Sequence, residues 1–265
     1  MTEDILKKIK QLPPLPESAM QIEAVYQDPD GSFSDMVKIL EKDPLLTADI
    51  LKAANSPLYG FSREINAINQ AVGLFGMGTV RGFALASIVK KSFTLDLSPY
   101  SMSNDMFSAF SKKQHALITS WCLKKENKLL GVLSPAAFLV EIGKVLIAQQ
   151  IMTDGKVQEF KDAIKELQNV EEAEKKIVGV TTPEVSATIF RQWKFEDGLV
   201  DVIGNCINPD DAKEADKKPA QILNVVRVAI PLDSKPTPET IAEAKKLIEQ
   251  YGLNMESFES AIEHF

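Results

Sequence analysis

Histidine is almost absent from this sequence of 265 residues, in which it occurs twice, at His115 and His264. His264 is the penultimate residue and is interpreted as part of a solvated tail. Nucleophilic sites of the Ser–His–Asp or Cys–His kind need a histidine as the base. Only His115 could serve, and no nucleophile motif accompanies it. The sequence therefore disfavours this form of covalent catalysis.

Cysteine and long apolar runs are also scarce. Cys122 and Cys206 are the only two cysteines, and two thiols at unrelated positions do not make a disulfide framework. No uninterrupted apolar stretch approaches the roughly 18 residues of a membrane span, and the acidic start shows no signal peptide. These absences predict a cytoplasmic protein that does not associate with membranes.

Positive charge is in deficit. The chain carries 30 basic against 37 acidic residues, a formal net charge of -7. Nonspecific binding to nucleic acid or to an anionic membrane needs a basic surface, so neither is an expected partner. One segment is locally basic, and we interpret it as a solvated helix face rather than a binding patch. Its lysines are Lys112, Lys113, Lys124, Lys125 and Lys128.

The strict apolar–polar alternation of a strand is missing as well, and helical signals take its place. Asp43-Pro44 reads as an N-cap followed by proline at the first helical position, where the missing N–H costs nothing. Ser134-Pro135 repeats this pattern, and Ser32 with Asp35 resembles a capping box. Further apolar helices are predicted over Thr79 to Phe93 and Phe107 to Lys125. The fold class is therefore expected to be all-α.

Proline-containing breaks suggest how the helices are grouped. The break at Ser98-Pro99 predicts an N-terminal helical subdomain over residues 1–97 and a larger helical bundle over 98–232. Residues 233–265 are expected to add a C-terminal helical extension packed on the same domain. Short loops throughout favour packed antiparallel helices over flexible linkers.

Two short motifs admit a structural and a functional interpretation. Gly73, Gly76 and Gly78 suggest a phosphate-binding loop, but the Lys-Ser/Thr pair that follows such a loop is missing, so close helix packing is the better account. Asn55-Ser56-Pro57 is interpreted as a helix stop. The alternative is that its polar side chains contact a ligand or a partner.

A series of motifs in a fixed order extends from Leu12 to Arg81. They are Leu12-Pro13-Pro14-Leu15-Pro16, Lys42-Asp43-Pro44-Leu45-Leu46, Leu51 to Tyr59, Ala71 to Gly76, and Arg81. The order and spacing of these motifs resemble the HDOD family, the HD-related output domain, and the similarity continues to about residue 232. The resemblance implies an all-helical bundle of the HD-domain-like type with a role in bacterial signal transduction.

Within this resemblance, Leu139 to Lys144 is similar to the Leu-His-Asp-Ile-Gly-Lys signature of HD-type metal-dependent phosphohydrolases. Val140 stands at the histidine position and Glu141 at the aspartate position. The resemblance also places Cys206-Ile207 where the family has a His-His doublet, and Ile230 where it has its last aspartate. His115 matches the first histidine. Valine and isoleucine cannot ligate a metal, so several helices have lost ligands.

A remnant metal set of His115, Glu141 and Cys206 could still be drawn, since each residue type can coordinate a transition metal. We expect instead that Glu141 is a buried structural partner of His115, because an unpaired buried carboxylate is costly. The leading hypothesis is a non-catalytic signalling protein that binds a protein partner or a small ligand and needs no cofactor. The alternative is a degenerate metal-dependent phosphohydrolase acting on a nucleotide or phosphoester.

Residues for partner or ligand contacts are harder to select. Asn55, Ser56 and Arg81 are the candidates that the resembling motifs supply. For a small nucleotide signal, arginines would be needed in a pocket, and Arg63, Arg81 and Arg191 are possible. No motif joins these three arginines.

Overall fold

The computed structural model describes residues 2–59, 63–123, 125–232 and 235–265. Among these residues every regular element is a helix, as the sequence predicts, and none is a strand. The first six α-helices are α1 (Glu3–Lys10), α2 (Glu17–Gln27), α3 (Phe33–Glu41), α4 (Pro44–Ala54), α5 (Ile68–Lys91) and α6 (Asn104–Cys122). The next five are α7 (Leu130–Leu139), α8 (Gly143–Thr153), α9 (Val157–Leu167), α10 (Val170–Val178) and α11 (Thr182–Gln192).

The C-terminal α-helices are α12 (Asp197–Asn205), α13 (Glu214–Ala229), α14 (Pro238–Tyr251) and α15 (Met255–Ile262). Short 3-10 helices complete the elements of the described residues: η1 (Pro57–Tyr59), η2 (Ser98–Tyr100), η3 (Asn127–Leu129) and η4 (Pro209–Asp211). One continuous cluster of buried apolar side chains runs through the molecule, from Ile5 in α1 to Ile262 in α15.

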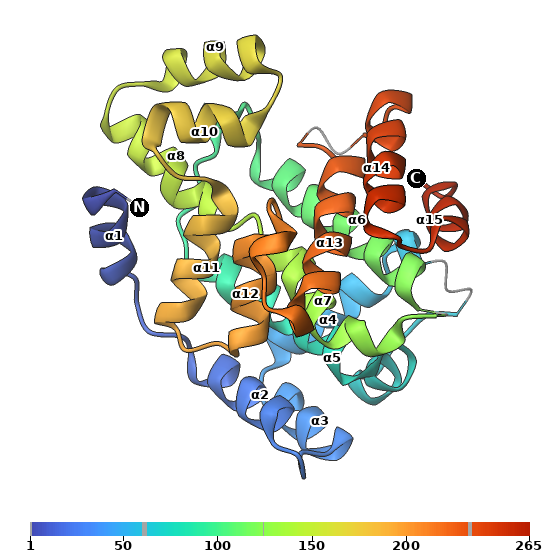
Figure 1. Ribbon diagram of the computed structural model, residues 1–265. Helices are drawn as coiled ribbons and strands as arrows, with labels where there is room; N and C mark the ends of the chain where they lie inside the picture. Colours follow the sequence, from blue (N-terminus) through green and yellow to red (C-terminus); the bar gives the residue numbers. More distant parts are fainter. Residues whose placement is uncertain (1, 60–62, 124, 233–234) are drawn as a thin grey trace.

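The centre of the molecule is the pair α5 and α7, which lie against each other (Figure 1). Helices α2, α3 and α4 cover α5, while α6 and α12 pack on α7. Glycines let the central pair approach closely. A Cβ at Gly78 would lie 2.8 Å from the Cα of Gly131, and one at Gly82 would lie 2.7 Å from Ser134 Oγ. Helix α7 is therefore held directly on the backbone of α5.

The glycine-rich segment of α5 has a structural role that differs from residue to residue. Gly78 serves close packing, as expected from the sequence. Gly76 has a φ of 79° and produces a kink inside α5, a backbone angle that favours glycine. A Cβ at Gly73 would meet nothing within 4 Å. Packing explains Gly78, whereas a local bend explains Gly76.

Two of the expected helix starts are confirmed and one is wrong. Asp43 accepts hydrogen bonds from the N–H groups of Leu45 and Leu46 at the start of α4, and Ser32 caps α3. Pro135, in contrast, lies inside α7 rather than at its start. A proline there leaves the carbonyl four residues earlier without its helical donor. That carbonyl, of Gly131, accepts instead from Arg81 Nη1 at 3.3 Å.

The chain ends pack across the expected groups of helices. Helix α1 lies against α8 and α11 (Figure 1), and Gln192 Nε2 donates to the carbonyl of Ile9 at 2.7 Å. Helix α14 packs on α13, and α15 packs on α6. The indole N–H of Trp121 donates to the carbonyl of Asn254 at 3.0 Å. The first helix thus contacts the bundle assigned to residues 98–232, and the boundary at residue 97 stays a prediction.

Two described segments are long and apolar enough to cross a membrane by length and composition alone. They are Ile68–Lys91 and Asn127–Thr153, whose most apolar windows are 61% and 89% buried inside the protein. The first segment is α5 and the second includes α7 and α8. Their burial against other helices is that of core helices.

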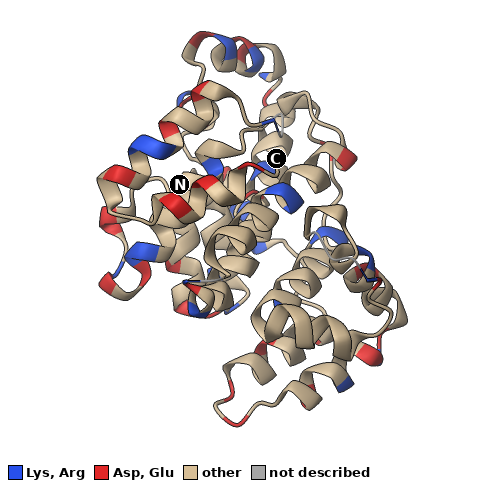
Figure 2. Ribbon diagram, turned by 90° about the vertical axis from the view of Figure 1, so that its right-hand side faces the viewer, with Lys and Arg blue, Asp and Glu red and all other residues tan. Residues whose placement is uncertain are grey.

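Acidic and basic residues both occur along many of the helices in the view of Figure 2.

Candidate functional site: a buried ion cluster at the metal-site positions

The connection between α7 and α8, residues 140–142, carries the two positions where the HD-type signature has its metal ligands. Ser186 of α11 holds this connection, since its hydroxyl donates to the carbonyl of Val140 at 2.6 Å and accepts from the N–H of Gly143 at 2.8 Å. A Cβ at Gly143 would lie 2.4 Å from the carbonyl oxygen of Thr182. The retained Gly143 therefore serves close packing of α8 on α11.

Glu141 lies between two cations in the protein interior. Its Oε1 accepts from Arg227 Nε at 2.8 Å, and its Oε2 forms an ion pair with Lys144 Nζ at 2.9 Å. Glu141 is 1% exposed. Burial on its own would raise the pKa of this carboxyl, but the charges of Arg227 and Lys144 hold it at about 2. Glu141 is therefore an ionised carboxylate beside two protein cations: Oε1 accepts a hydrogen bond from Arg227, whereas Oε2 has the ion pair with Lys144 but no hydrogen bond.

Arg227 of α13 joins the remaining acidic and thiol groups. Its Nη2 donates to Glu171 Oε1 at 2.6 Å, and its Nη1 lies 3.8 Å from Cys206 Sγ. Although burial alone lowers the pKa of Arg227, the neighbouring Glu141 raises it well above the ordinary value. Burial raises the pKa of Cys206 to about 11, so this cysteine is a neutral thiol.

Lys144 extends the cluster to α10 and α11. Its Nζ lies 3.3 Å from Glu174 Oε1 and donates to Thr182 Oγ1 at 3.2 Å. Glu174 also accepts from the Tyr100 hydroxyl at 2.9 Å and from the N–H of Thr182 at 2.6 Å. Burial raises the pKa of Glu174. We call Glu141, Lys144, Glu171, Glu174 and Arg227 the buried ion cluster, in which Glu171 lies at the edge and is half-buried.

His115 lies in different surroundings, inside a group of aromatic rings. Its ring is stacked on Phe138 with the centroids 4.2 Å apart. Nδ1 is 2.5 Å from the Tyr59 hydroxyl and Nε2 is 2.8 Å from Ser134 Oγ. Burial lowers the pKa of His115 to about 3, so the imidazole is neutral near pH 7.

The expected pairing of His115 with Glu141 is therefore wrong. His115 is bonded to the hydroxyls of Tyr59 and Ser134, whereas Glu141 is paired with Lys144 and Arg227. Arg227 of α13 satisfies the carboxylate more strongly than a neutral imidazole could, because charge-assisted hydrogen bonds are about twice as strong as neutral ones, and Lys144 of α8 adds an ion pair.

The residues at the HD-type positions do not fit a metal ion. His115, Glu141 and Cys206 do not come together as a ligand set, and the described part of the chain has no group of three or more His, Cys, Asp or Glu side chains that could hold one. Cys206 is a protonated thiol beside Arg227, and a thiol must lose its proton to ligate. A divalent cation near Glu141 would also face the positive charges of Arg227 and Lys144.

The other candidate residues are scattered. Asn55 ends α4, where its amide donates to the carbonyls of Leu51 and Ile65 and its oxygen accepts from the N–H of Ile65. Its φ of -83° is not left-handed, so these bonds, rather than an unusual backbone angle, explain the asparagine. Ser56 next to it is half-buried, while Arg63 and Arg191 are exposed.

Arg81 is fully buried in a network of its own. Its Nε and Nη2 donate to the two oxygens of Glu23 at 2.6 and 2.7 Å, and its Nη1 donates to Glu196 at 2.8 Å. The guanidinium carbon lies 4.2 Å from the centre of the Tyr26 ring. Arg81 thus ties α2, α5 and the start of α12 together, with its donors directed at protein groups.

Sequence reasoning missed Arg227, Lys144 in its paired role, and Tyr59. Arg227 lies three residues before Ile230, which matches the last HD-type aspartate, and one helical turn separates such positions. A search for charged residues within one turn of each lost ligand would have selected Arg227. Tyr59 is the last residue of a quoted family motif, but no local pattern indicates that it meets His115.

The fold and these positions define an all-α protein of the HD-like kind with altered ligand positions. The family model described as the HDOD domain matches residues 12–209. The chain belongs to the HDOD family, which confirms the resemblance read from its motifs. Its helical architecture is also that of an HDOD domain protein of unknown function from Geobacter sulfurreducens, with a TM-score of 0.66, 16% identity, and coverage of 98% of this chain and 95% of the other.

Similar proteins carry varied names. A virulence factor from Campylobacter jejuni is 27% identical with a TM-score of 0.57, and the match covers 97% of this chain and 93% of that one. A protein from Shewanella amazonensis that is provisionally named a phosphohydrolase has a TM-score of 0.69 at 23% identity, with 98% and 93% covered. An uncharacterized protein from Treponema pallidum is 30% identical over 77 residues, which are 29% of this chain and 15% of that protein.

Proposed function

We propose that this protein is a non-catalytic regulator in bacterial signal transduction, acting in the cytoplasm by binding a protein partner through its helical surface. Membership of the HDOD family supports the signalling role. A further structural relative, from Marinobacter aquaeolei, is provisionally named a signal transduction protein; its TM-score is 0.69 at 19% identity, with coverage of 100% of this chain and 59% of the other. At that identity the relative shows the fold alone, so the signalling role rests on the family.

The placement of Arg227 is the observation that carries the non-catalytic part of the proposal. Its guanidinium contacts Glu141 and Cys206, two of the three remnant ligand candidates. A hydrolase of the HD type needs ligands that converge on a metal with an open position for water. In this protein a fixed cation of the chain itself compensates Glu141.

Metal binding and hydrolysis test this part of the proposal. The purified chain is incubated with Mn²⁺, Fe²⁺ or Zn²⁺, passed over a desalting column, and measured by elemental analysis and by hydrolysis of bis-p-nitrophenyl phosphate. We expect less than stoichiometric metal and no metal-dependent turnover. One bound metal per chain, with turnover that Glu141→Gln abolishes, would establish the alternative, a degenerate metal-dependent phosphohydrolase.

Chemical cross-linking in the native cell tests the signalling part. A tagged chain is cross-linked in vivo, and its partners are identified by mass spectrometry and then purified for titration. We expect a direct complex with a component of a signalling pathway, reproduced with the two purified proteins. A chain that titrates with none of its cross-linked candidates in purified form would contradict the proposed role.

A further inference from the structure

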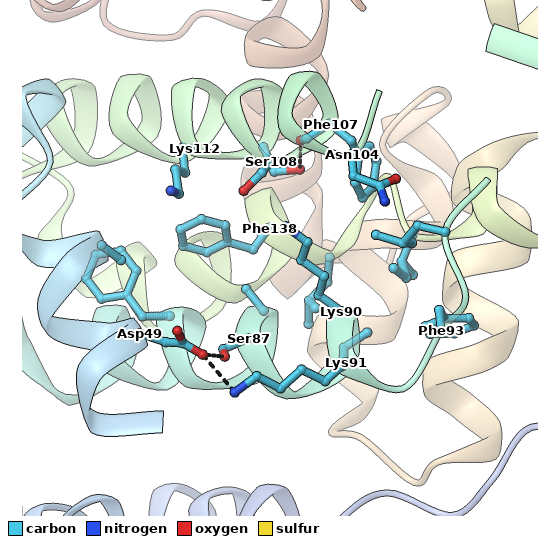
Figure 3. A pocket seen from close by; sticks show the side chains of 18 of the residues that line it. Asp49, Ser87, Lys90, Lys91, Phe93, Asn104, Phe107, Ser108, Lys112 and Phe138 are labelled. Atoms are coloured by element: carbon cyan, nitrogen blue, oxygen red, sulfur yellow. Dashed lines mark hydrogen bonds and ion pairs between the residues drawn. The ribbon is translucent and has the colours of Figure 1, made fainter. Parts of the chain in front are cut away.

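A pocket with a volume of about 480 Å³ lies between α4 and α5 on one side and α6 and α7 on the other. Small-molecule sites commonly measure about 300–1,000 Å³. Figure 3 shows Lys112 and Ser108 on one side of this space, Asp49, Ser87 and Lys91 on the opposite side, and Phe138 between them. The pocket is thus formed by residues from both sides of the break at Ser98-Pro99.

The apolar part of the pocket is rich in rings. Phe83, Phe93, Phe107 and Phe138 line it. Leu95, Leu139 and Ile142 add aliphatic surface. Rings and aliphatic groups lining a concave site favour a ligand with a flat apolar body, because that body removes apolar area from water on both partners.

The charged part of the pocket is strongly positive, although the chain as a whole has a net charge of -7. Four lysines and one aspartate line it, so the difference of 4 and 1 gives +3. The lysines are Lys52, Lys90, Lys91 and Lys112. The Asp49 carboxylate forms an ion pair with Lys91 Nζ at 2.8 Å and accepts a hydrogen bond from the Ser87 hydroxyl at 2.6 Å.

Three of these cations lie outside the ion pairs of the described residues, and Asp49 is the one acidic residue that lines the pocket with them. Lys52, Lys90 and Lys112 form no ion pair with any residue that the structure describes. Partial burial lowers the pKa of Lys112, and the charges of Lys52 and Lys90 lower it further, against an opposing effect of Asp49. Like charges gathered in a concave site repel one another and focus a positive potential there, which an anion relieves.

We propose that this pocket, named here the lysine–phenylalanine pocket, binds a small organic anion whose aromatic body lies against the phenylalanines and whose anionic group is held by Lys52, Lys90 and Lys112. Nucleoside monophosphates and aromatic carboxylates share this chemistry. Arg63, Arg81 and Arg191 do not line the pocket, so lysines replace the arginines expected from the sequence. The site does not depend on whether the protein is catalytic.

Binding to the pocket also has a geometric consequence. The bound anion would contact Lys52 on α4, Lys90 on α5 and Lys112 on α6 at the same time. One ligand would therefore hold helices from both sides of the Ser98-Pro99 break together. Such a contact is suited to a protein that reports the presence of a small molecule to a partner.

The probe for the test is 8-anilinonaphthalene-1-sulfonate, which carries an aromatic body and one anionic group. Its fluorescence is titrated against the wild-type chain and against Lys90→Gln/Lys112→Gln. We expect one site per chain and at least about tenfold weaker binding for the double variant, because two charge-assisted contacts are lost. The matched control is Lys165→Gln/Lys246→Gln, which makes the same charge change at exposed lysines outside the pocket and should bind like the wild type.

A second variant fills the space without changing the charge. Ala86→Trp places an indole into the pocket and should abolish the single-site signal, while far-ultraviolet circular dichroism checks that the fold is kept. Equal binding by the wild type, the lysine double variant and Ala86→Trp would overturn the proposal, as would the absence of a saturable site in the wild type.

Competition then separates the two sources of the anion. AMP, adenosine, inorganic phosphate and benzoate are each added to the complex of the wild type with the fluorescent probe. Displacement by AMP together with failure of adenosine identifies an organic phosphate, and displacement by benzoate identifies an aromatic carboxylate. Displacement by adenosine as readily as by AMP would contradict a site that recognises an anion.

Discussion

His115 and Glu141 match two ligands of a single metal in the HD-type pattern, yet they lie in opposite kinds of surroundings. His115 is neutral among aromatic rings and hydroxyls. Glu141 is ionised between Arg227 and Lys144. Both side chains are buried, so the contrast comes from their neighbours rather than from exposure.

The comparison shows two ways in which this protein satisfies buried groups at positions of the HD-type pattern. A buried carboxylate needs a positive partner, and the chain supplies a covalently attached one from α13. A buried imidazole needs no counter-charge if it stays neutral, because hydrogen bonds satisfy both ring nitrogens. The cost of removing Glu141 and His115 from water is therefore offset in two different ways, by a cation for Glu141 and by neutral hydrogen-bond partners for His115.

Removal of Arg227 should have the largest effect on this contrast. Arg227→Met leaves the buried Glu141 with Lys144 alone and removes the partner of the half-buried Glu171, and breaking a buried pair from one side costs about 3–5 kcal/mol. Urea unfolding at pH 7 measures the loss. The double variant Glu141→Gln/Arg227→Met should recover part of it, and a loss below about 1 kcal/mol for the single variant would contradict the buried ion cluster.

The second-largest effect is expected in the pH dependence of the free energy of unfolding, which should distinguish His115 from Glu141. The folded pKa of His115 is lowered to about 3 from 6.5. Below pH 6.5 the unfolded chain binds a proton there that the folded chain does not. The stability from a neutral His115 is therefore fully present above pH 6.5 and falls as the pH drops, by about 1.4 kcal/mol for each pH unit.

His115→Gln should remove this slope between pH 6.5 and 4.5, as measured by urea unfolding over that range. Glu141 acts in a lower window, because its folded pKa is about 2 against 4.5. The stability that Glu141 contributes is present above pH 4.5 and lost towards pH 2. If the free energy of unfolding has the same slope between pH 6.5 and 4.5 in the wild type and in His115→Gln, then His115 binds its proton in the folded state as readily as in the unfolded chain, which would contradict the lowered pKa.

Gly143→Ala should give a smaller effect that tests the retained part of the signature. A Cβ would meet the carbonyl oxygen of Thr182 at 2.4 Å, and overpacking of this kind costs about 1–3 kcal/mol. Gly73→Ala is the matched control, since a Cβ there meets nothing within 4 Å. In thermal unfolding, the melting temperature should fall for Gly143→Ala and rise for Gly73→Ala. Equal stability of the two variants would show that packing does not explain Gly143.

Tyr59→Phe should have the smallest effect, because it removes one hydroxyl from His115 and keeps the ring. The expected loss is about 1 kcal/mol, the usual net worth of one hydrogen bond. Nitrogen-15 chemical shifts of the imidazole provide the specific measurement. The Nδ1 resonance should move while Nε2, bonded to Ser134, stays nearly unchanged; movement of both nitrogens to the same extent would contradict the assigned contacts.

Much of the fold was predictable because helical signals are local. Capping at Asp43 and Ser32, the helical periodicity and the ordered motifs all follow from neighbours in sequence. The place of Pro135 inside α7 does not follow from its neighbours in sequence, because the group that compensates for this proline is distant along the chain. Arg81, 54 positions earlier in the chain, donates to the carbonyl of Gly131 that Pro135 leaves free.

The sequence by itself determined the all-α class, the family, and the absence of histidine and aspartate at positions where an HD-type metal site needs them. Only the tertiary structure decided which groups took their place. Arg227 and Glu141 are 86 positions apart, and His115 and Tyr59 are 56 apart. The charge state of a buried group depends on the burial and the partners that such distant contacts supply, and no periodicity along the chain encodes them.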